Sequence, residues 1–371
     1  MIKIYYGPTS SFEKIIPSKE ITTLTKLLTD LELKNKQFRI TTNQDSVNFD
    51  SESYIENLVV STEEYSRLSE SGINAFVSIL NETKINNMYF QNPPKIVYEQ
   101  LDRYYENVEV EEHIYSKISE KDVKQFVDNF SENILGQDSC KTKISNCLYK
   151  IAKGYNNKKP LVLLLYGPAG VGKTETAKFL CSILEQELFR KQFSMYQNYS
   201  FADYVFGSNH NSSSLARDLL DRESNVILFD EFDKPNNIFY SAFYQLFDEG
   251  VFVDKNYTLN LKNSIIICTS NFKDLADVRK TLGDPICSRF DAFIEYKELA
   301  EALKPYGDGK GKLPTADFQV KLVTDDTGKN IASENIEIDF LDVSKPDRNF
   351  GTFWNYTLKL KHVTSTTKVY N

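Results

Sequence analysis

The chain has 371 residues, of which 41% are hydrophobic and 26% charged, a composition typical of a globular protein long enough for two or three domains. Its formal net charge of −8 repels phosphate backbones and argues against a nucleic-acid partner. No stretch is long and apolar enough to cross a bilayer, and the first residues lack a secretion signal, so we expect a cytoplasmic protein without a membrane partner.

Residues 1–125 mix short strand-like and helix-like segments, which predicts an α+β N-terminal domain of unassigned role. Apolar residues recur every three to four positions over 21–31 and 63–80 and predict helices there. The pair Pro93 and Pro94 interrupts the pattern, and the apolar residues that follow suggest a helix leading to the next domain.

The pattern changes over residues 126–304, where short apolar runs alternate with amphipathic helices. This alternation predicts an α/β domain, a parallel sheet with helices on both faces. A Gly- and Lys-rich stretch at 305–314 is typical of a linker. Three short segments within residues 315–371, at 318–322, 336–340 and 356–360, alternate apolar and polar side chains, which predicts a small β-rich C-terminal domain.

The most specific chemical signal is GPAGVGKT, which fits the Walker A pattern GxxxxGK[ST] without exception and lies between a strand-like run and a helix. Its glycines let successive amide N–H groups turn toward phosphate oxygens at a helix N-terminus. The lysine is expected to reach the β- and γ-phosphates of ATP, and the threonine hydroxyl to ligate Mg²⁺. The predicted nucleotide-binding residues here are Gly167, Pro168, Ala169, Gly170, Val171, Gly172, Lys173, Thr174 and Glu175.

A second strand-like run, Val226 to Phe229, ends in two carboxylates and is typical of a Walker B motif. Asp230 is expected to hold Mg²⁺, together with Thr174. Glu231 is expected to polarise the attacking water. The two Walker motifs together predict an enzyme that hydrolyses the phosphoric anhydride bond of ATP.

Residues 134–299 resemble the C-terminal ATPase module of the Clp-type unfoldases and disaggregases, a branch of the AAA+ superfamily. The run DEFDKPNNIFYSAFYQLFDEGVFVD, from Asp230 to Asp254, matches the branch pattern DEIEKAxxxVxxxLLQxxDxGxxxD without a gap. The resemblance implies a P-loop NTPase fold of the AAA+ type. It also implies that Ile134 and Leu135, in the segment ILGQD, pack against adenine.

The same resemblance implies two further catalytic residues. A strand-like run ends in TSN, where Asn271 would orient the lytic water or sense the γ-phosphate. The segment DPICSRFD is similar to the branch's PEFxNRxD run, in which Arg289 would reach the γ-phosphate bound to a neighbouring subunit. A surface salt bridge is the alternative role of Arg289. A finger that acts on a neighbour implies that copies of the chain form a hexamer or a similar ring.

Two departures from the branch bear on function. Tyr204 to Ser208 resembles the segment before the aromatic GYVG pore loop, but the continuation Asn209 to Ser214 is shorter, polar and without tyrosine. A polar loop cannot grip a side chain by apolar contact, which argues against threading. No sensor 2 arginine is recognised after Arg289, and without that transition-state cation hydrolysis is expected to be slow or to depend on a partner.

The sequence therefore favours two functions. The first is an oligomeric AAA+ protein that remodels a protein partner by hydrolysing ATP. The second is an ATP-gated scaffold or switch that recruits an effector, as in a bacterial defence assembly. A nucleic-acid motor or loader is disfavoured by the acidic charge.

Overall fold

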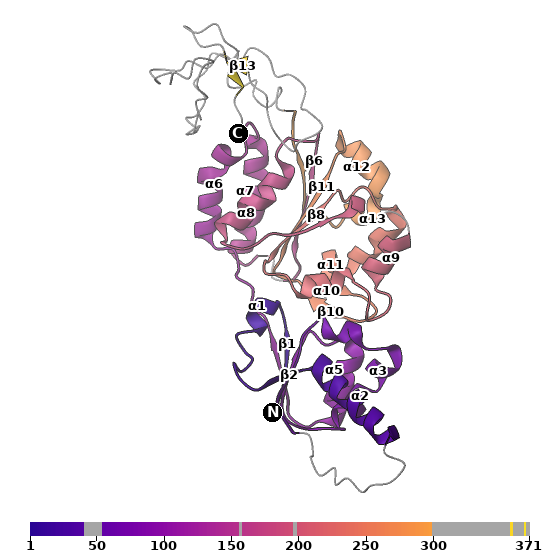
Figure 1. Ribbon diagram of the computed structural model, residues 1–371. Coiled ribbons are helices and arrows are strands. Elements are labelled where there is room, and N and C mark those ends of the chain that lie inside the picture. The colour runs from indigo at the N-terminus through magenta and orange to yellow at the C-terminus, as the bar shows by residue number, and fades with distance from the viewer. Residues whose placement is uncertain (41–53, 156–157, 196–198, 299–356, 359–366, 369–371) are drawn as a thin grey trace, which may run out of the picture.

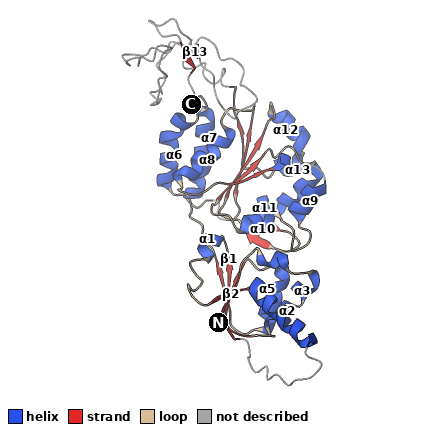
Figure 2. Cartoon of the chain, viewed as in Figure 1, coloured by secondary structure: helices blue, strands red, loops and turns tan. Residues whose placement is uncertain are grey.

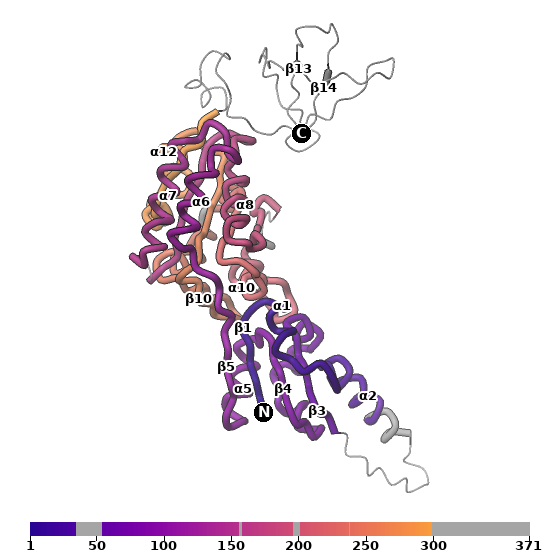
Figure 3. Tube along the Cα trace, turned by 90° about the vertical axis from the view of Figure 1, so that its left-hand side faces the viewer, coloured from indigo at the N-terminus to yellow at the C-terminus, as the bar shows by residue number. Residues whose placement is uncertain are grey.

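The computed structural model describes residues 1–40, 54–155, 158–195, 199–298, 357–358 and 367–368. Two units, each built around a sheet, follow one another along the chain and lie end to end (Figures 1 and 3). Within the described ranges, no helix combines the length and the apolar character needed to traverse a lipid bilayer.

The N-terminal unit is a five-stranded sheet in the order β2-β3-β4-β1-β5. All of its described strand pairs are parallel. The unit is therefore α/β, which corrects the α+β class expected from the sequence, because local periodicity does not encode the direction in which strands pair. The strands are β1 (Ile2–Tyr6), β2 (Ile21–Thr23), β3 (Tyr54–Val60), β4 (Lys84–Gln91) and β5 (Val108–Glu112).

Helices connect these strands because parallel neighbours require crossovers. The larger apolar core lies between the sheet and the helices that follow β2, β3 and β4, and includes Ile4, Leu58 and Phe90. A smaller cluster on Tyr5 and Tyr89 is closed by Phe12. The connecting elements are α1 (Thr9–Phe12), α2 (Leu24–Ile40), η1 (Glu64–Arg67), α3 (Glu70–Asn74), α4 (Phe76–Leu80) and α5 (Lys95–Tyr104).

The second unit is a five-stranded sheet in the order β12-β6-β11-β8-β7, parallel in every described pair. The three central strands are buried at every position, which is why they read as continuous apolar runs. The predicted parallel α/β sheet is thus confirmed. Its strands are β6 (Leu161–Tyr166), β7 (Phe189–Gln192), β8 (Val226–Asp230), β11 (Ile265–Ser270) and β12 (Ala292–Glu295).

Helices cover both faces of this second sheet, as predicted (Figure 2). One face carries α6 (Glu120–Asn133), α7 (Asp138–Ala152) and α8 (Lys173–Ile183). The other face carries α9 (Tyr199–Phe206), α10 (Leu215–Leu220), η3 (Asn237–Phe243), α11 (Tyr244–Glu249), α12 (Leu275–Leu282) and α13 (Asp284–Cys287). The short 3-10 turn η2 (Phe193–Met195) follows β7, and a hairpin of β9 (Val251–Val253) and β10 (Thr258–Asn260) points toward the N-terminal unit.

The connection between the two units lies before α6. This helix begins with a capping box at Ser119, and its side chains Val123, Phe126 and Phe130 lie in the core of the second unit. The boundary predicted at residue 125 falls inside this continuous helix. The segment between β5 and α6 is the structural junction.

The predicted C-terminal β domain, 315–371, lies outside the described residues except for two short strands. β13 (Thr357–Leu358) and β14 (Thr367–Lys368) pair antiparallel. The predicted linker at 305–314 is also outside the described residues.

Candidate functional site

The loop between β6 and α8 is shaped by glycines. Gly167, Gly170 and Gly172 have φ values of +140°, +77° and +100°. A Cβ on Gly167 would lie 2.2 Å from the carbonyl oxygen of Tyr296, so only glycine fits there without movement of the backbone. Such a loop, ending at the N-terminus of α8, presents backbone N–H groups as phosphate-binding loops do.

Lys173 is buried at the start of α8, with 7% of its surface exposed. Its ammonium donates to the carbonyl oxygens of Gly167 at 2.7 Å and Pro168 at 2.6 Å, and to Oδ1 of Asn271 at 3.1 Å. Burial lowers the pKa of Lys173 to about 8, against the opposing effect of nearby carboxylates. All three acceptors are neutral, so the partly desolvated charge attracts an anion strongly.

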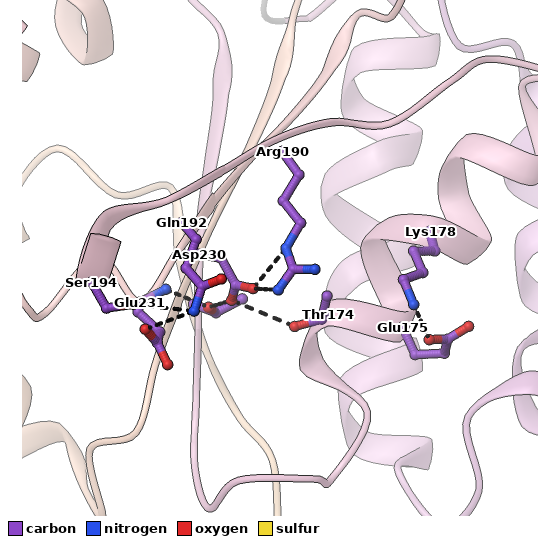
Figure 4. Close-up of polar contacts among 9 residues, drawn as sticks. Thr174, Glu175, Lys178, Arg190, Gln192, Ser194, Asp230 and Glu231 are labelled. Carbon is purple, nitrogen blue, oxygen red and sulfur yellow. Dashed lines mark hydrogen bonds and ion pairs between the residues drawn. The ribbon is translucent and has the colours of Figure 1, made fainter. Parts of the chain in front are cut away.

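Asp230 ends β8 and is almost fully buried, at 6% exposure. Its Oδ1 accepts a hydrogen bond from the hydroxyl of Thr269 and lies 3.5 Å from the hydroxyl of Thr174. A carboxylate and a hydroxyl thus converge at the base of the loop (Figure 4). Hard oxygen donors of this kind are the ligands that Mg²⁺ prefers, so the residues fit the predicted ion.

Arg190, which belongs to none of the sequence motifs, forms an ion pair with Asp230. Its Nη2 and Nε donate to Oδ2 of Asp230 at 2.5 and 3.0 Å. Gln192, two residues further along β7, donates to Oε2 of Glu231 at 3.2 Å. Alternation along a strand places both side chains on one face, and the β7–β8 pairing aligns Gln192 with Asp230 (Figure 4). Alternation along the strand is a sequence signal that groups the two residues, but it does not show that β7 lies beside β8.

Glu231 follows β8 in a left-handed conformation, with φ of +57°. Such a conformation costs a non-glycine residue about 1–2 kcal/mol. The Glu231 N–H donates to the hydroxyl of Thr269 at 3.0 Å, which fixes the backbone just beyond the strand. The carboxyl ends of the adjacent strands β6, β11 and β8 meet here: Asp230 ends β8, Glu231 and Asn271 directly follow β8 and β11, and the loop that carries Lys173 follows β6. Parallel α/β sheets place their ligands at this edge.

The remaining predicted nucleotide residues lie around the loop. Ile134 is buried, and a Cβ on Gly172 would stand 3.1 Å from its Cγ2, so it packs directly against the loop. Leu135 is 45% exposed. Val171 is buried, Ala169 is exposed, and Glu175 forms an exposed ion pair of 3.1 Å with Lys178 (Figure 4).

Arg289 lies apart from this group. Its Nε donates to Oδ2 of Asp248 at 2.8 Å, Nη1 donates to the carbonyl of Pro285, and the guanidinium lies 4.3 Å from the ring centroid of Tyr244. Among the described residues these are its contacts, and they match the salt-bridge alternative. A role in catalysis would therefore require a second copy of the chain.

The family comparison bears on this site. Residues 158–305 match the family model described as AAA domain (Cdc48 subfamily), which covers the loop, Asp230, Asn271 and Arg289. This segment is an AAA+ domain. The predicted fold is thereby confirmed for the segment that carries the candidate site, and the AAA+ domain is a member of a family of nucleotide-binding ATPases.

Three curated relatives extend the similarity of the AAA+ domain to the Clp proteins. Chaperone protein ClpB of Chlamydia muridarum is 31% identical over 193 residues, covering 48% of this chain and 22% of the relative. ClpB of Clostridium tetani is 33% identical over 156 residues, covering 39% and 18%. The ATP-dependent Clp protease ATP-binding subunit ClpL of Staphylococcus aureus (strain MRSA252) is 30% identical over 190 residues, covering 45% and 27%. The chain thus spans about a quarter or less of the length of these relatives, and the predicted resemblance to Clp-type proteins is confirmed for the ATPase module.

Proposed function

We propose that the chain binds Mg·ATP at the loop between β6 and α8, hydrolyses it, and as an oligomer uses the energy to remodel a protein partner. The observation that carries the proposal is the convergence of Asn271 and Asp230 on Lys173 and Thr174 of the loop. The similarity to an ATP-binding subunit and to chaperones supports it.

Each side chain has a role that follows from its position. The loop from Gly167 to Glu175 cradles the phosphates, and Lys173 exchanges its carbonyl partners for phosphate oxygens. Thr174 and Asp230 hold Mg²⁺, which when bound neutralises developing charge on the phosphates. Glu231 polarises the attacking water, and Asn271, beside Lys173, orients it.

The adenine base of ATP would lie against residues 134–137, the segment that precedes α7. Ile134 forms the floor of the loop, and Leu135 offers an exposed apolar side chain for adenine. Gln137 braces this segment, since it donates to the carbonyl of Lys297 at 2.9 Å and accepts from its N–H at 3.2 Å. The base is therefore bounded by elements that are far apart in sequence.

Arg289 would act on the nucleotide of a neighbouring copy in a ring. Its ion pair with Asp248 is half exposed on the acid side, at 47%, and exposed pairs are worth at most about 1 kcal/mol. Exchanging Asp248 for a γ-phosphate is therefore inexpensive, and an arginine finger is worth about 10³–10⁵ in turnover.

The test combines ATP turnover with solution mass, with and without ATP, for wild type, Glu231→Gln and Arg289→Ala. We expect ATP to drive a ring-sized species and both substitutions to lower turnover by at least about a hundredfold. Asp248→Ala is the matched control, because it removes the partner of Arg289 but leaves the finger. Normal hydrolysis by Glu231→Gln would contradict the catalytic assignment.

A second candidate, an ATP-gated scaffold, is favoured by one specific contact. His210, in the polar loop that replaces the pore loop, is buried and donates from Nε2 to the carbonyl of Leu68 in the N-terminal unit at 2.9 Å. A loop seated against the chain's own N-terminal unit is not free to grip another polypeptide. ATP-dependent unfolding of a tagged substrate would reject the scaffold, whereas ATP-driven assembly without unfolding would favour it.

A further inference from the structure

A cavity of about 490 Å³ lies between the two units, away from the nucleotide loop. The N-terminal side contributes Tyr6, Tyr98 and the junction segment 113–115, and the AAA+ domain contributes Arg222 and the β10 region. Figure 3 shows α10 and β10 facing α1, β1 and β5 across this junction. The volume is within the range of about 300–1000 Å³ typical of small-molecule sites, which often lie between domains.

Arg222 is the unusual residue of this cavity. It is 95% buried, since only 5% of its surface is exposed, yet among the described residues no carboxylate pairs with it. Nη1 donates to the carbonyl of Leu219 at 2.7 Å, and the guanidinium lies 3.9 Å from the ring centroid of Tyr115. Nε is buried and has no hydrogen-bond partner. Burial lowers the pKa of the guanidinium to about 10, which reflects the cost of an uncompensated buried charge.

The two acids next to Arg222 in sequence are engaged elsewhere. Asp221 accepts hydrogen bonds from the N–H and hydroxyl of Thr9 at 2.7 and 2.9 Å, and Glu223 accepts from the hydroxyl of Ser10 at 2.6 Å. They tie α1 to the AAA+ domain. Neither acid supplies a counter-charge to Arg222, which belongs to the lining of the cavity.

The rest of the lining reinforces the positive field. Lys117 and Lys262 also line the cavity, and Glu112 is the acidic residue among its described lining residues. The rings of Tyr6, Tyr98 and Tyr115 supply flat apolar surface, and the hydroxyl of Tyr115 donates to the carbonyl of Arg222 at 3.1 Å. A ligand that fits this lining carries a negative group at one end and an apolar or aromatic body at the other.

We propose that the junction cavity is a binding site for a small organic anion, a carboxylate or a phosphate, whose charged group pairs with Arg222. The anion supplies the counter-charge that the chain lacks, and its body contacts both units at once. Binding therefore fixes the N-terminal unit relative to the AAA+ domain. This site is separate from the nucleotide loop, and the inference holds whether or not the chain hydrolyses ATP.

The test uses phenyl phosphate and benzoate as anionic probes and phenol as their neutral counterpart. Affinities are measured by titration calorimetry with saturating Mg·ADP, and are repeated with Lys173→Ala to exclude binding at the nucleotide loop. We expect at least one anion to bind the wild type at least about tenfold more tightly than phenol, because charge-assisted hydrogen bonds to a buried guanidinium are strong. The preferred anion distinguishes a phosphate ligand from a carboxylate ligand.

Arg222→Met, which keeps the volume but removes the charge, should weaken the preferred anion at least about tenfold and leave phenol unchanged. Without ligand its unfolding midpoint should equal or exceed that of the wild type, because the uncompensated buried charge is gone. Lys262→Gln, on the AAA+ side of the cavity, should weaken the anion by a few fold, and Lys280→Gln, on α12 outside the cavity lining, should have no effect.

The proposal would be overturned if no anion bound the wild type better than phenol does, or if Arg222→Met kept the preference for the anion. If Arg222→Met does not fold, the proposal would be overturned by a Lys262→Gln variant that binds the anion as tightly as the wild type does. A failure of ATP binding at the nucleotide loop leaves these measurements unaffected, because they are made with Lys173→Ala as well. Success with Lys173→Ala would show that the cavity, and not the loop, takes the anion.

Discussion

At the scale of single residues, the ion pair between Arg190 and Asp230 makes a specific prediction about Mg²⁺. Arg190→Gln removes the cation that compensates the charge of Asp230, whose side chain is 8% exposed. We expect the variant to lose about 1–3 kcal/mol of unfolding free energy in EDTA and to recover part of it with excess Mg²⁺, because the metal can replace the missing charge. Urea unfolding with and without Mg²⁺ measures both effects.

Lys191→Gln is the control for this experiment. Lys191 is the next residue on β7 and pairs with Asp218 at 2.5 Å, so its loss should not change the response to Mg²⁺. If Arg190→Gln responded to Mg²⁺ no more than wild type does, Arg190 would not share the carboxylate with the metal.

Two glycines of the loop are expected to respond differently to alanine. Gly167→Ala brings a Cβ to 2.2 Å from a carbonyl oxygen at a φ of +140°, and we expect a loss of about 2–5 kcal/mol. Gly170→Ala meets no atom within 4 Å, and its φ of +77° alone should cost about 1–2 kcal/mol. Thermal unfolding of both variants tests the order, and a larger loss for Gly170→Ala would contradict the loop geometry.

How far single residues were predictable depended on whether their contacts were local. Lys173, Asp230 and Asn271 belong to short sequence motifs, and the structure places Asn271 against Lys173 and Asp230 against the neighbouring Thr174. The contact of Arg190 with Asp230 could not be predicted, because it depends on which strand pairs with β7. Arg289 fits its motif, but the described contacts place it in an intrachain salt bridge.

At the scale of elements, the polar loop that contacts the N-terminal unit can be tested directly. His210→Ala removes a buried hydrogen bond of 2.9 Å to the carbonyl of Leu68, so opening of this contact should become about tenfold more frequent. Hydrogen exchange over residues 64–74 and 205–214 measures it. Asn209→Ala alters an exposed side chain of the same loop and serves as control. Unchanged exchange in His210→Ala would mean that the loop is held by other contacts.

Element boundaries were harder to predict than element types. The helix expected over 63–80 is three short pieces, because the Ser69 hydroxyl accepts from the N–H of Gly72 and starts a new helix there, and Ala75 leaves the helical conformation with φ of −109°. The helix expected from residue 21 begins after a short strand, since Ile21–Thr23 pairs with β3.

At the scale of the whole molecule, the contacts across the junction predict that the two units respond together to nucleotide. Beyond the hydrogen bonds of Thr9 and Ser10, the N–H of Lys95 donates to the carbonyl of Asn256 at 2.8 Å. We expect ADP at about a hundred times its Kd to stabilise the AAA+ domain by about 2.7 kcal/mol, and the slowest-exchanging amides of the N-terminal sheet to gain protection as well.

Asp221→Ala is the variant that should uncouple them, because it removes both hydrogen bonds from Thr9 but leaves the nucleotide loop intact. The N-terminal gain should shrink in this variant and the gain in the AAA+ domain should persist. Nucleotide protection confined to the AAA+ domain of the wild type would show that the units unfold independently.

The whole-molecule architecture was predictable where a continuous motif covered it and not elsewhere. The parallel sheet of the AAA+ domain, with helices on both faces, was predicted from the alternation of apolar runs and helices and from the Walker motifs, whereas its strand order comes from the structure. The N-terminal sheet has no such motif, and its parallel pairing rests on contacts between strands far apart in sequence. Local patterns carry no information about those pairings.

The position of β1 in the N-terminal sheet has a consequence for how the protein is made. β1 lies between β4 and β5, so Ile4 pairs with Phe90 on one side and Val110 on the other. On a ribosome, β1 emerges long before either neighbour, and it has no strand partner in the sheet until β4 has been translated. The other pairs, β2 with β3 and β3 with β4, can form in the order of synthesis. We therefore expect the insertion of β1 to be a late step in the folding of the N-terminal unit. Before that step the nascent chain is the form most accessible to chaperones and most prone to aggregation.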